Sequence, residues 1–322
     1  MHSKPIVATT IGDPCGIGPE VLVKALAEKA DDAHHLLIGD AQVLADAIEL
    51  TNTPLDIRVV NSVNDATFDA NCLTVLDPNS LDRSHITVGQ VSAECGRATV
   101  QWWDIATALA RAGTVQAIVK GPINSEAIRL AGFSPQGAVN PGRTYLFLIT
   151  GPLRVVHFTD HIPLRDVFKH LSIDALVDLI RLTHRSLRNW GYQSPRIGVA
   201  GINPHAEGDE ERQQIAPAIA VAQADGIAVD GPVPPDSLFR QCAQAQYDCV
   251  IAHYHDQGHI AVKTWRFEGN CAIILGEPYV RASVAHGTAF DIAGKGSADH
   301  RSMACALRTA ASLAASRGFP AD

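Results

Sequence analysis

Short apolar runs alternate along this chain with longer segments of helical periodicity, and this alternation limits most strongly how the chain can fold. The expected strands are Pro5–Ile11, His35–Ile38, Ala117–Val119, Arg154–Phe158, Ile197–Ala200, Asp248–Ala252 and Ala272–Leu275. The expected helices are Pro19–Glu28, Ala41–Glu49, Gly89–Ala112, Ile173–Trp190, Glu210–Ala224 and Ser302–Arg317. Such alternation predicts an α/β fold, with helices on both faces of largely parallel sheets.

Length and composition exclude several classes of protein. With 322 residues, the chain is long enough for about two domains. Its formal net charge of −8 gives no basic field for nucleic acid. No stretch reaches the ~18 apolar residues of a membrane span, and the seven cysteines form no Cys-x-x-Cys pair. We therefore expect a cytoplasmic protein that contacts neither nucleic acid nor membrane.

A glycine-rich loop, Gly12–Glu20, directly follows the first expected strand. It fails the G-x-G-x-x-G spacing of a dinucleotide-binding fingerprint because Val21 stands where the third glycine would be. A tight strand-to-helix turn and a ligand-facing loop explain this segment equally well. The sequence therefore does not predict a classical Rossmann site.

Three histidine-bearing turns each follow an expected strand. They are Thr159–Pro163, Asn203–Ala206 and Tyr254–Gly258, which contribute His161, His205 and His255. Because ligands bind beyond the carboxyl ends of strands in such sheets, the three imidazoles could converge on one divalent ion. Asp160 and Asp256 could orient the rings. Each histidine taken alone could also be an ordinary surface or core residue.

Two further features could bind anions. Lys263 and Arg281 flank the expected strand Ala272–Leu275 and could clamp a phosphate or carboxylate, although by themselves they are better explained as ordinary surface charges. The loop His286–Gly296 combines glycines with a lysine, which suits an anionic cofactor. Its composition by itself indicates only a loop.

Four of these segments together resemble the 4-hydroxythreonine-4-phosphate dehydrogenase family. The segments are Gly12-Asp13-Pro14-x-Gly16-Ile17-Gly18-Pro19-Glu20, Gly231-Pro232-x-Pro234-x-Asp236-x-Leu238-Phe239, Tyr254-His255-Asp256-Gln257-Gly258 and His286-Gly287-Thr288-Ala289. Their order and spacing match from about residue 6 to residue 300. The loop His286–Gly296 also looks like the cofactor loop of isopropylmalate dehydrogenases.

The resemblance implies an architecture that the spacing did not show. It implies two α/β/α domains around a central cleft, in the manner of isopropylmalate dehydrogenases. We expect the first domain to comprise residues 1–125 and 270–322 and the second residues 126–269. The resemblance also implies a homodimer whose active site is shared between subunits.

The resemblance assigns roles to particular residues. The implied metal ligands are His161, His205 and His255. The implied substrate-binding residues are Arg143, Thr144, Lys263 and Arg281, and Lys263 and Asp236 are the implied catalytic residues. In the glycine-rich loop, the expected cofactor-binding residues are Gly287, Thr288, Gly294 and Lys295.

The chemistry that the resemblance implies is oxidation of a secondary alcohol by NAD or NADP, followed by loss of carbon dioxide from the β-keto acid. Three histidines with nearby carboxylates suit zinc, and cobalt, manganese or magnesium could replace it. No residue can be assigned to the ribose 2′ position, so NAD and NADP both stay open.

This chain departs from the family pattern at several substrate-facing positions. Arg143 replaces a histidine, Ala272 replaces an asparagine, Lys120 begins the loop that starts with threonine in the family, and Ser125 replaces a lysine. A permanent cation in place of a neutral-capable donor changes what a pocket can bind. The substrate could therefore be 4-phosphohydroxy-L-threonine, a 4-phospho-threonate or -erythronate, or an aromatic cis-dihydrodiol carboxylate. A non-catalytic protein that binds metal and anions is the alternative class.

Overall fold

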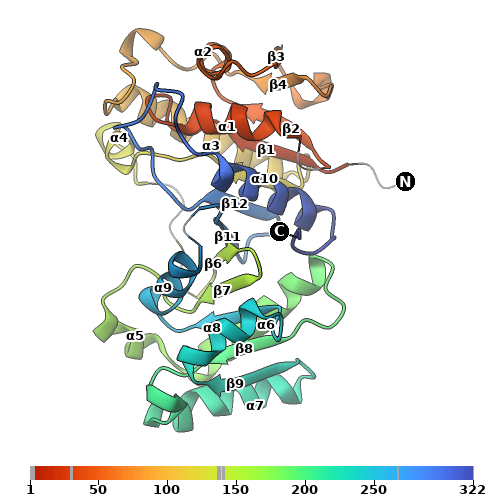
Figure 1. Ribbon diagram of the computed structural model, residues 1–322, viewed down its shortest axis with the longest axis vertical. Helices are drawn as coiled ribbons and strands as arrows, with labels where there is room; N and C mark the ends of the chain where they lie inside the picture. Colours follow the sequence, from red (N-terminus) through yellow and green to blue (C-terminus); the bar gives the residue numbers. More distant parts are fainter. Residues whose placement is uncertain (1–3, 30–31, 136–138, 140–141, 267, 322) are drawn as a thin grey trace. The chain divides into compact units, whose positions relative to one another are not determined.

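The computed structural model describes residues 4–29, 32–135, 139, 142–266 and 268–321. The chain divides into two compact units, Met1–Ala138 with Pro278–Ala315, and Val139–Glu277 with Ser316–Asp322 (Figure 1). These bounds differ from the expected residues 125 and 270. Helix α4 (Ser125–Leu130) packs against α3 (Ala93–Arg111) and extends the first unit. Phe319 packs against Phe147 and Trp190, which places the chain end in the second unit.

The first unit is built on parallel strands in the order β3-β4-β2-β1-β5-β12. Their bounds are β1 Ile6–Thr10, β2 His34–Ile38, β3 Asp56–Val60, β4 Cys72–Leu76, β5 Ala117–Lys120 and β12 Val280–Val284. The helices that accompany them are α1 Gly18–Ala27, α2 Ala41–Thr51, α3, α4 and α10 Arg301–Ala314. Helices α1 and α10 pack together on one face, while α3 covers the other (Figure 1).

The second unit has strands in the order β11-β6-β7-β10-β8-β9. Their bounds are β6 Tyr145–Thr150, β7 Leu153–His157, β8 Ile197–Ala200, β9 Val229–Val233, β10 Cys249–Ala252 and β11 Cys271–Leu275. Strand β6 is antiparallel to both neighbours, β11 and β7. Its pairing with β7 follows from their connection, because Gly151 and Pro152 are too short a link for a parallel crossover. The expectation of largely parallel strands therefore holds less well here than in the first unit.

The remaining elements complete the second unit and the connections. Its helices are α5 Leu164–His170, α6 Ile173–Asn189, α7 Ala216–Ala224, α8 Pro235–Ala243 and α9 His255–Trp265. Short turns of 3-10 helix cover Val63–Asp65, Arg83–His85 and Pro204–Ala206, and Glu211–Ile215 forms a π-helical turn before α7. Among the described residues, no helix combines the length and the apolar character needed to cross a bilayer.

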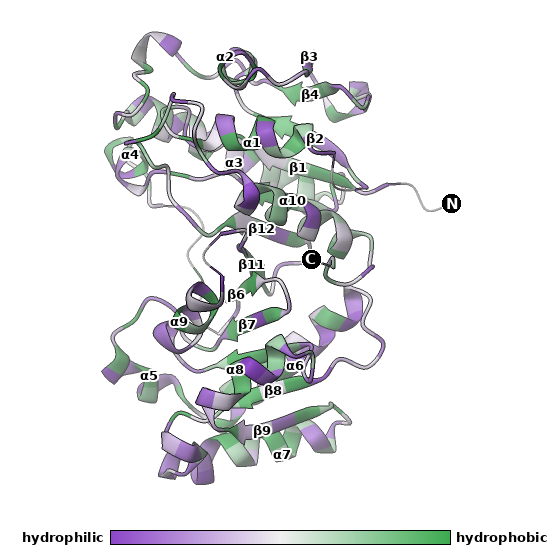
Figure 2. Cartoon of the chain, in the orientation of Figure 1, coloured by the Kyte–Doolittle hydropathy of each residue, from purple (hydrophilic) through white to green (hydrophobic). Residues whose placement is uncertain are grey.

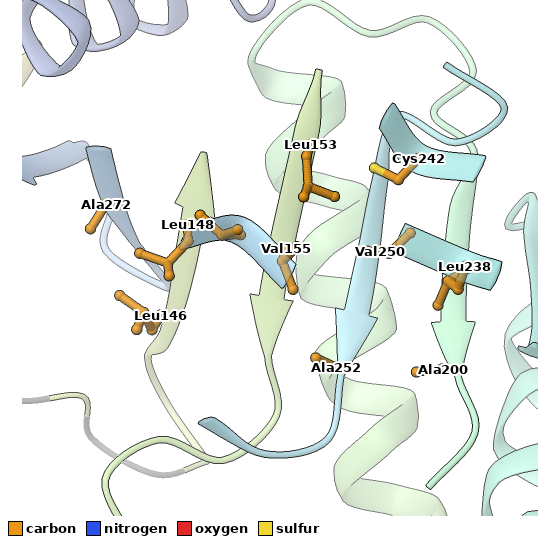
Figure 3. Close-up of a cluster of buried hydrophobic side chains, with 11 residues drawn as sticks. Leu146, Leu148, Leu153, Val155, Ala200, Leu238, Cys242, Val250, Ala252 and Ala272 are labelled. Atoms are coloured by element: carbon orange, nitrogen blue, oxygen red, sulfur yellow. The ribbon is translucent and has the colours of Figure 1, made fainter. Parts of the chain in front are cut away.

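Apolar side chains from the strands form the core of the second unit. Leu148, Val155 and Val250 lie on adjacent strands and contribute to one buried cluster, which α8 closes with Leu238 (Figure 3). Figure 2 shows β7 and β8 as mainly hydrophobic, whereas the helices carry residues of both kinds. Because this cluster fixes β7 beside β10, it also fixes the loops that leave these strands.

Candidate functional site

The residues that follow β7 and β10 form a histidine-rich group in the second unit. These strands pair in parallel, with Ala252 opposite His157, so their carboxyl ends lie at the same edge of the sheet. Asp160 and His161 lie in the loop that leaves β7, and His255 comes shortly after the end of β10. The segment around His255 was expected to be a turn. Instead His255 is the first residue of α9, which holds its backbone in a helix.

Asp160, His161 and His255 bring their ligand atoms together. One side-chain donor atom from each lies within 4.8 Å of the other two. The Nδ1 atom of His161 is 2.9 Å from Asp160 Oδ1, and the Nδ1 atom of His255 is 2.7 Å from Asp256 Oδ1. The Asp160 side chain is only 15% exposed, and its carboxylate can bind a cation as well as the His161 ring. The group thus offers imidazole and carboxylate donors, which are typical ligands of divalent metal ions.

Two histidines that the sequence analysis did not single out lie behind this group. The ring of His259 stacks on His255 with centroids 3.6 Å apart, and the ring of His157 lies 4.7 Å from that of His259. Burial, with a smaller effect from His259, lowers the pKa of His157 to about 3. Burial, with a smaller effect from His255, lowers the pKa of His259 to about 4. Both rings are therefore neutral at pH 7 and add no positive charge beside the donor group.

Gly258 sets how closely α9 approaches β7. A Cβ atom at this position would lie 2.2 Å from Nε2 of His157, whose ring is buried and whose Nδ1 is 3.3 Å from the Leu146 carbonyl oxygen. We expect Gly258→Ala to push α9 outward and to lower the free energy of unfolding by about 1–3 kcal/mol. This overpacking should exceed the gain of about 1 kcal/mol in helix propensity. Urea unfolding of the two proteins measures the difference.

Gly287→Ala is the matched control, because nothing lies within 4 Å of a Cβ atom at Gly287 and its φ is not positive. We expect this variant to unfold within about 0.5 kcal/mol of the wild type. If Gly258→Ala were as stable as Gly287→Ala, the close packing of α9 on His157 would not determine the position of His255.

His205 does not join Asp160, His161 and His255 in their compact group. It lies exposed on the turn Pro204–Ala206, with a φ of 58°. The turn is held by the buried Glu211, whose Oε1 accepts hydrogen bonds from the backbone N–H groups of Ile202 (2.6 Å) and Asn203 (2.9 Å). All three histidines were expected to converge because each follows a strand. Within one chain, His205 does not lie with His161 and His255.

The other residues expected at the site in this unit lie outside the histidine-rich group. Arg143 and Thr144 immediately precede β6. Asp236 lies in the first turn of α8, and Lys263 lies in the last turn of α9. Arg143, Asp236 and Lys263 are exposed, so each side chain is accessible to a small molecule.

In the first unit, the two glycine-bearing motifs pack against each other. The backbone N–H of Ile17 donates to the Thr288 carbonyl oxygen at 3.0 Å, and a Cβ atom on Gly16 would lie 2.7 Å from the Thr288 Cβ. Glu20 Oε1 accepts hydrogen bonds from Lys24 Nζ and from the Ala298 backbone N–H, both at 2.7 Å. Gly16 and Glu20 thus hold the loop His286–Gly296 and the residues after it in place, which gives both a structural role.

The remaining expected cofactor residues lie in turns of the same loop. Gly294 has a φ of 72°, in the left-handed region that favours glycine. Lys295 Nζ donates to the Asp291 carbonyl oxygen at 2.6 Å, while Gly287 is exposed. The loop therefore presents backbone groups at Gly287 and a lysine whose charge is partly engaged within the loop.

Beneath the first glycine-rich loop lies a buried polar cluster. Cys15 Sγ is 3.3 Å from Cys95 Sγ, and both side chains are fully buried. Asp13 Oδ1 accepts a hydrogen bond from the Cys15 backbone N–H at 2.9 Å, whereas Asp13 Oδ2 is buried without a hydrogen-bond partner. Burial raises the pKa of Asp13 to about 6. The thiol of Cys15 therefore lies inside the unit.

Arg281 is buried within β12. Its guanidinium carbon lies 4.9 Å from the centre of the Trp103 ring, and the Nζ atom of Lys120 lies 5.6 Å from the same ring. Arg281 belongs to the first unit, whereas Lys263 belongs to the second.

The two units have α/β folds, and the second carries carboxylate and imidazole donors where strands end, an arrangement typical of enzymes of the α/β class. Comparison with known proteins identifies the family within this class. Residues 31–310 match the family described as pyridoxal phosphate biosynthetic protein PdxA, and the chain belongs to this family.

Relatives match the chain over nearly its whole length. A protein from Novosphingobium aromaticivorans is 46% identical, covering 98% of this chain and 97% of its own. A D-threonate 4-phosphate dehydrogenase from Salmonella typhimurium is 40% identical, covering 96% and 98%. The crystal structure of a 4-hydroxythreonine-4-phosphate dehydrogenase from Klebsiella pneumoniae has a TM-score of 0.85 at 40% identity, covering 96% and 99%. That of a terephthalate 1,2-cis-dihydrodiol dehydrogenase from Burkholderia xenovorans has a TM-score of 0.69 at 32% identity, covering 96% and 98%.

Proposed function

We propose that this chain oxidises a small anionic hydroxy acid with NAD or NADP, with decarboxylation, and that a divalent metal ion assists the reaction. The observation that carries the proposal is the compact group of Asp160, His161 and His255, found in a chain whose relatives are named as dehydrogenases of hydroxy compounds.

The donor set fits a divalent ion. His161 and His255 each have one ring nitrogen near a carboxylate, an arrangement that leaves the other nitrogen for a metal. The carboxylate of Asp160, whose side chain is only 15% exposed, favours a cation at the same place. Such an ion, with zinc favoured over cobalt, manganese or magnesium, would polarise the hydroxyl group of the substrate.

The protein's own residues would position the substrate and move protons. In the overall reaction, the carbinol carbon gives a hydride to the nicotinamide and the hydroxyl oxygen gives up a proton. The β-keto acid then loses carbon dioxide, and the resulting enolate takes up a proton. We assign the proton transfers to Lys263 and Asp236, whose exposed side chains can reach a small molecule, and substrate binding to Arg143, Thr144 and Lys263 in the same unit. Arg281 supplies a further cation.

The loop after β12 is the proposed site of the nicotinamide cofactor. A Cβ atom on Gly287 would have nothing within 4 Å, so the backbone there is open to a ligand. Gly294 turns the chain and Thr288 anchors it on the first glycine-rich loop. Lys295 adds a positive charge for a cofactor phosphate.

We also propose that the active unit is a homodimer with a shared site. Its support is the separation of His205 from His161 and His255 within one chain, which is expected when a ligand set is completed by a second subunit. The described cysteines are free, which is compatible with a cytoplasmic enzyme.

A substrate screen tests the proposed function. Formation of reduced cofactor and of carbon dioxide would be measured with 4-phosphohydroxy-L-threonine, D-threonate 4-phosphate, D-erythronate 4-phosphate and a terephthalate cis-dihydrodiol, with NAD and NADP, with and without zinc. We expect metal-dependent turnover of at least one acid. If no acid were oxidised while the protein bound metal and anions, the non-catalytic class would replace this proposal.

A further inference from the structure

The buried cluster beneath the first glycine-rich loop groups three potential metal ligands in the first unit. Asp13 and Cys15 lie in the loop that leaves β1, and Cys95 lies in the first turn of α3. One donor atom from each side chain lies within 4.8 Å of the other two. All three residues are fully buried, so the group belongs to the interior of the unit and not to its surface.

One acceptor in this cluster has no hydrogen-bond partner among the described residues. Asp13 Oδ1 accepts the hydrogen bond from the Cys15 backbone N–H at 2.9 Å, whereas Asp13 Oδ2 accepts none. A buried carboxylate oxygen left in this way is unfavourable, and a bound ion compensates it. The neighbouring groups are two thiols, which are weak hydrogen-bond donors but strong metal ligands once deprotonated. The surroundings of Asp13 Oδ2 therefore suit a metal ion better than a water molecule.

The two thiols are spaced almost as two ligands of one ion. Cys15 Sγ is 3.3 Å from Cys95 Sγ. Sulfur ligands of one tetrahedral zinc ion lie about 3.8 Å apart, so this pair needs to open by only about 0.5 Å. A disulfide would instead require the two sulfur atoms to close to about 2.05 Å, a movement of more than about 1 Å. The spacing is therefore nearer to that of a shared ion than to that of a disulfide.

We propose that Asp13, Cys15 and Cys95 bind a structural zinc ion, separate from the ion at the histidine-rich group of the second unit. Two thiolates and a carboxylate form a soft anionic donor set, which selects zinc over magnesium or manganese. Three protein donors leave one position of a tetrahedral ion for a backbone carbonyl oxygen or a water molecule. Because the site is buried, the ion is acquired as the unit folds. With the ion bound, the Asp13 carboxyl stays ionised, so its titration is observed only in metal-free protein.

An ion at this site links the first glycine-rich loop to α3. Thr99 Oγ1 of α3 already donates to the Gly12 carbonyl oxygen, at 3.4 Å. Ligation through Cys95 adds a stronger link at the beginning of the same helix. The loop in turn supports the proposed cofactor loop, because the Ile17 backbone N–H donates to the Thr288 carbonyl oxygen at 3.0 Å. The role of the ion is therefore to hold the backbone that carries the cofactor loop.

Cobalt substitution tests the site, because thiolate ligands of cobalt(II) give charge-transfer absorption in the near ultraviolet that imidazole and carboxylate ligands do not. Among the described residues, the other group that could hold an ion contains no cysteine. The full chain would be produced in cobalt-supplemented medium and dialysed against a chelator, which empties the more exposed histidine-rich group. We expect the wild type to retain about one cobalt ion per chain, together with the thiolate absorption.

Substitutions assign the retained ion to particular side chains. Cys95→Ala should lose both the ion and the near-ultraviolet absorption, whereas His161→Ala should keep both. Cys249→Ala removes an equally buried thiol from β10 of the second unit and is the matched control, which should also keep both. Circular dichroism establishes that each variant is folded. The wild-type spectrum decides the proposal even where Cys95→Ala does not fold.

A chelator-treated wild type that holds no cobalt, or that lacks the thiolate absorption, would overturn the proposal. So would a folded Cys95→Ala protein that keeps both. A disulfide between Cys15 and Cys95, found by mass analysis of peptides after alkylation without reductant, would also contradict a shared ion. None of these measurements requires turnover, so their outcome does not depend on the proposed dehydrogenase function.

Discussion

Removal of divalent ions by a chelator is expected to abolish the dehydrogenase activity, and added zinc is expected to restore it. Asp160, His161 and His255 offer their donors within 4.8 Å of one another, and without an ion nothing in this group polarises a hydroxyl. We expect a fall of at least about 100-fold in kcat/KM, because changes in residues that merely support metal ligands already cost 10–100-fold. Activity should be measured together with metal content by atomic emission.

Substitution of the ligands separates metal binding from other roles of these side chains. His161→Ala and His255→Ala should each lower both metal content and rate. His170→Ala, at an exposed histidine in the last turn of α5, should lower neither. His205→Ala decides whether the third histidine belongs to the site, since it should lower metal content only if a second subunit brings it to the ion. Full activity in a metal-free preparation would contradict the proposed metal centre.

The second large effect is expected from Asp13, through the pH dependence of stability. Burial raises the pKa of this carboxyl from 3.8 to about 6 in the folded protein. Its contribution to stability is therefore complete below about pH 4 and is lost as pH rises through 6. A shift of about two pKa units corresponds to about 3 kcal/mol. The wild type should lose up to this amount between pH 4 and pH 8.

Asp13→Asn removes this titration while keeping an oxygen that accepts the hydrogen bond from the Cys15 backbone N–H. Relative to the wild type, the variant should gain up to about 3 kcal/mol in free energy of unfolding between pH 4 and pH 8. Urea unfolding at the two pH values measures the change. Asp209→Asn, at an exposed aspartate, controls for the loss of one negative charge. A pH-independent difference for Asp13→Asn would show that Asp13 is charged or neutral throughout this range.

Sequence reasoning finds seven of the described strands, and it misses β3, β4 and the apolar β6 as well as elements whose pattern is interrupted. Strand β12 carries Arg281 at its second residue, and a buried arginine does not look like part of a strand. Strand β9 contains Gly231 and Pro232, which predict a turn rather than a strand. The segment of helix α9 predicts a turn because Gly258 is a weak helix former. In each case tertiary packing overrides the local preference.

The candidate site was only partly predictable for related reasons. His161 and His255 were found because both follow strands, and parallel pairing of β7 with β10 brings them together. His259 was missed because its i, i+4 relation to His255 becomes a signal only when the segment is known to be a helix. Lys120 appeared only as a departure from a family pattern. Its proximity to Trp103 and Arg281 depends on residues far apart in the sequence, which no local pattern reveals.

The turn that carries His205 has an energetic consequence for the second unit. His205 and Ala206 have φ values of 58° and 57°, in a region that costs a residue other than glycine roughly 1–2 kcal/mol. The hydrogen bonds that Glu211 accepts from Ile202 and Asn203, each worth about 1.5–3 kcal/mol for a charged acceptor, offset this strain. The buried Glu211 thus stabilises a backbone conformation at the exposed His205 that would be unfavourable without these hydrogen bonds.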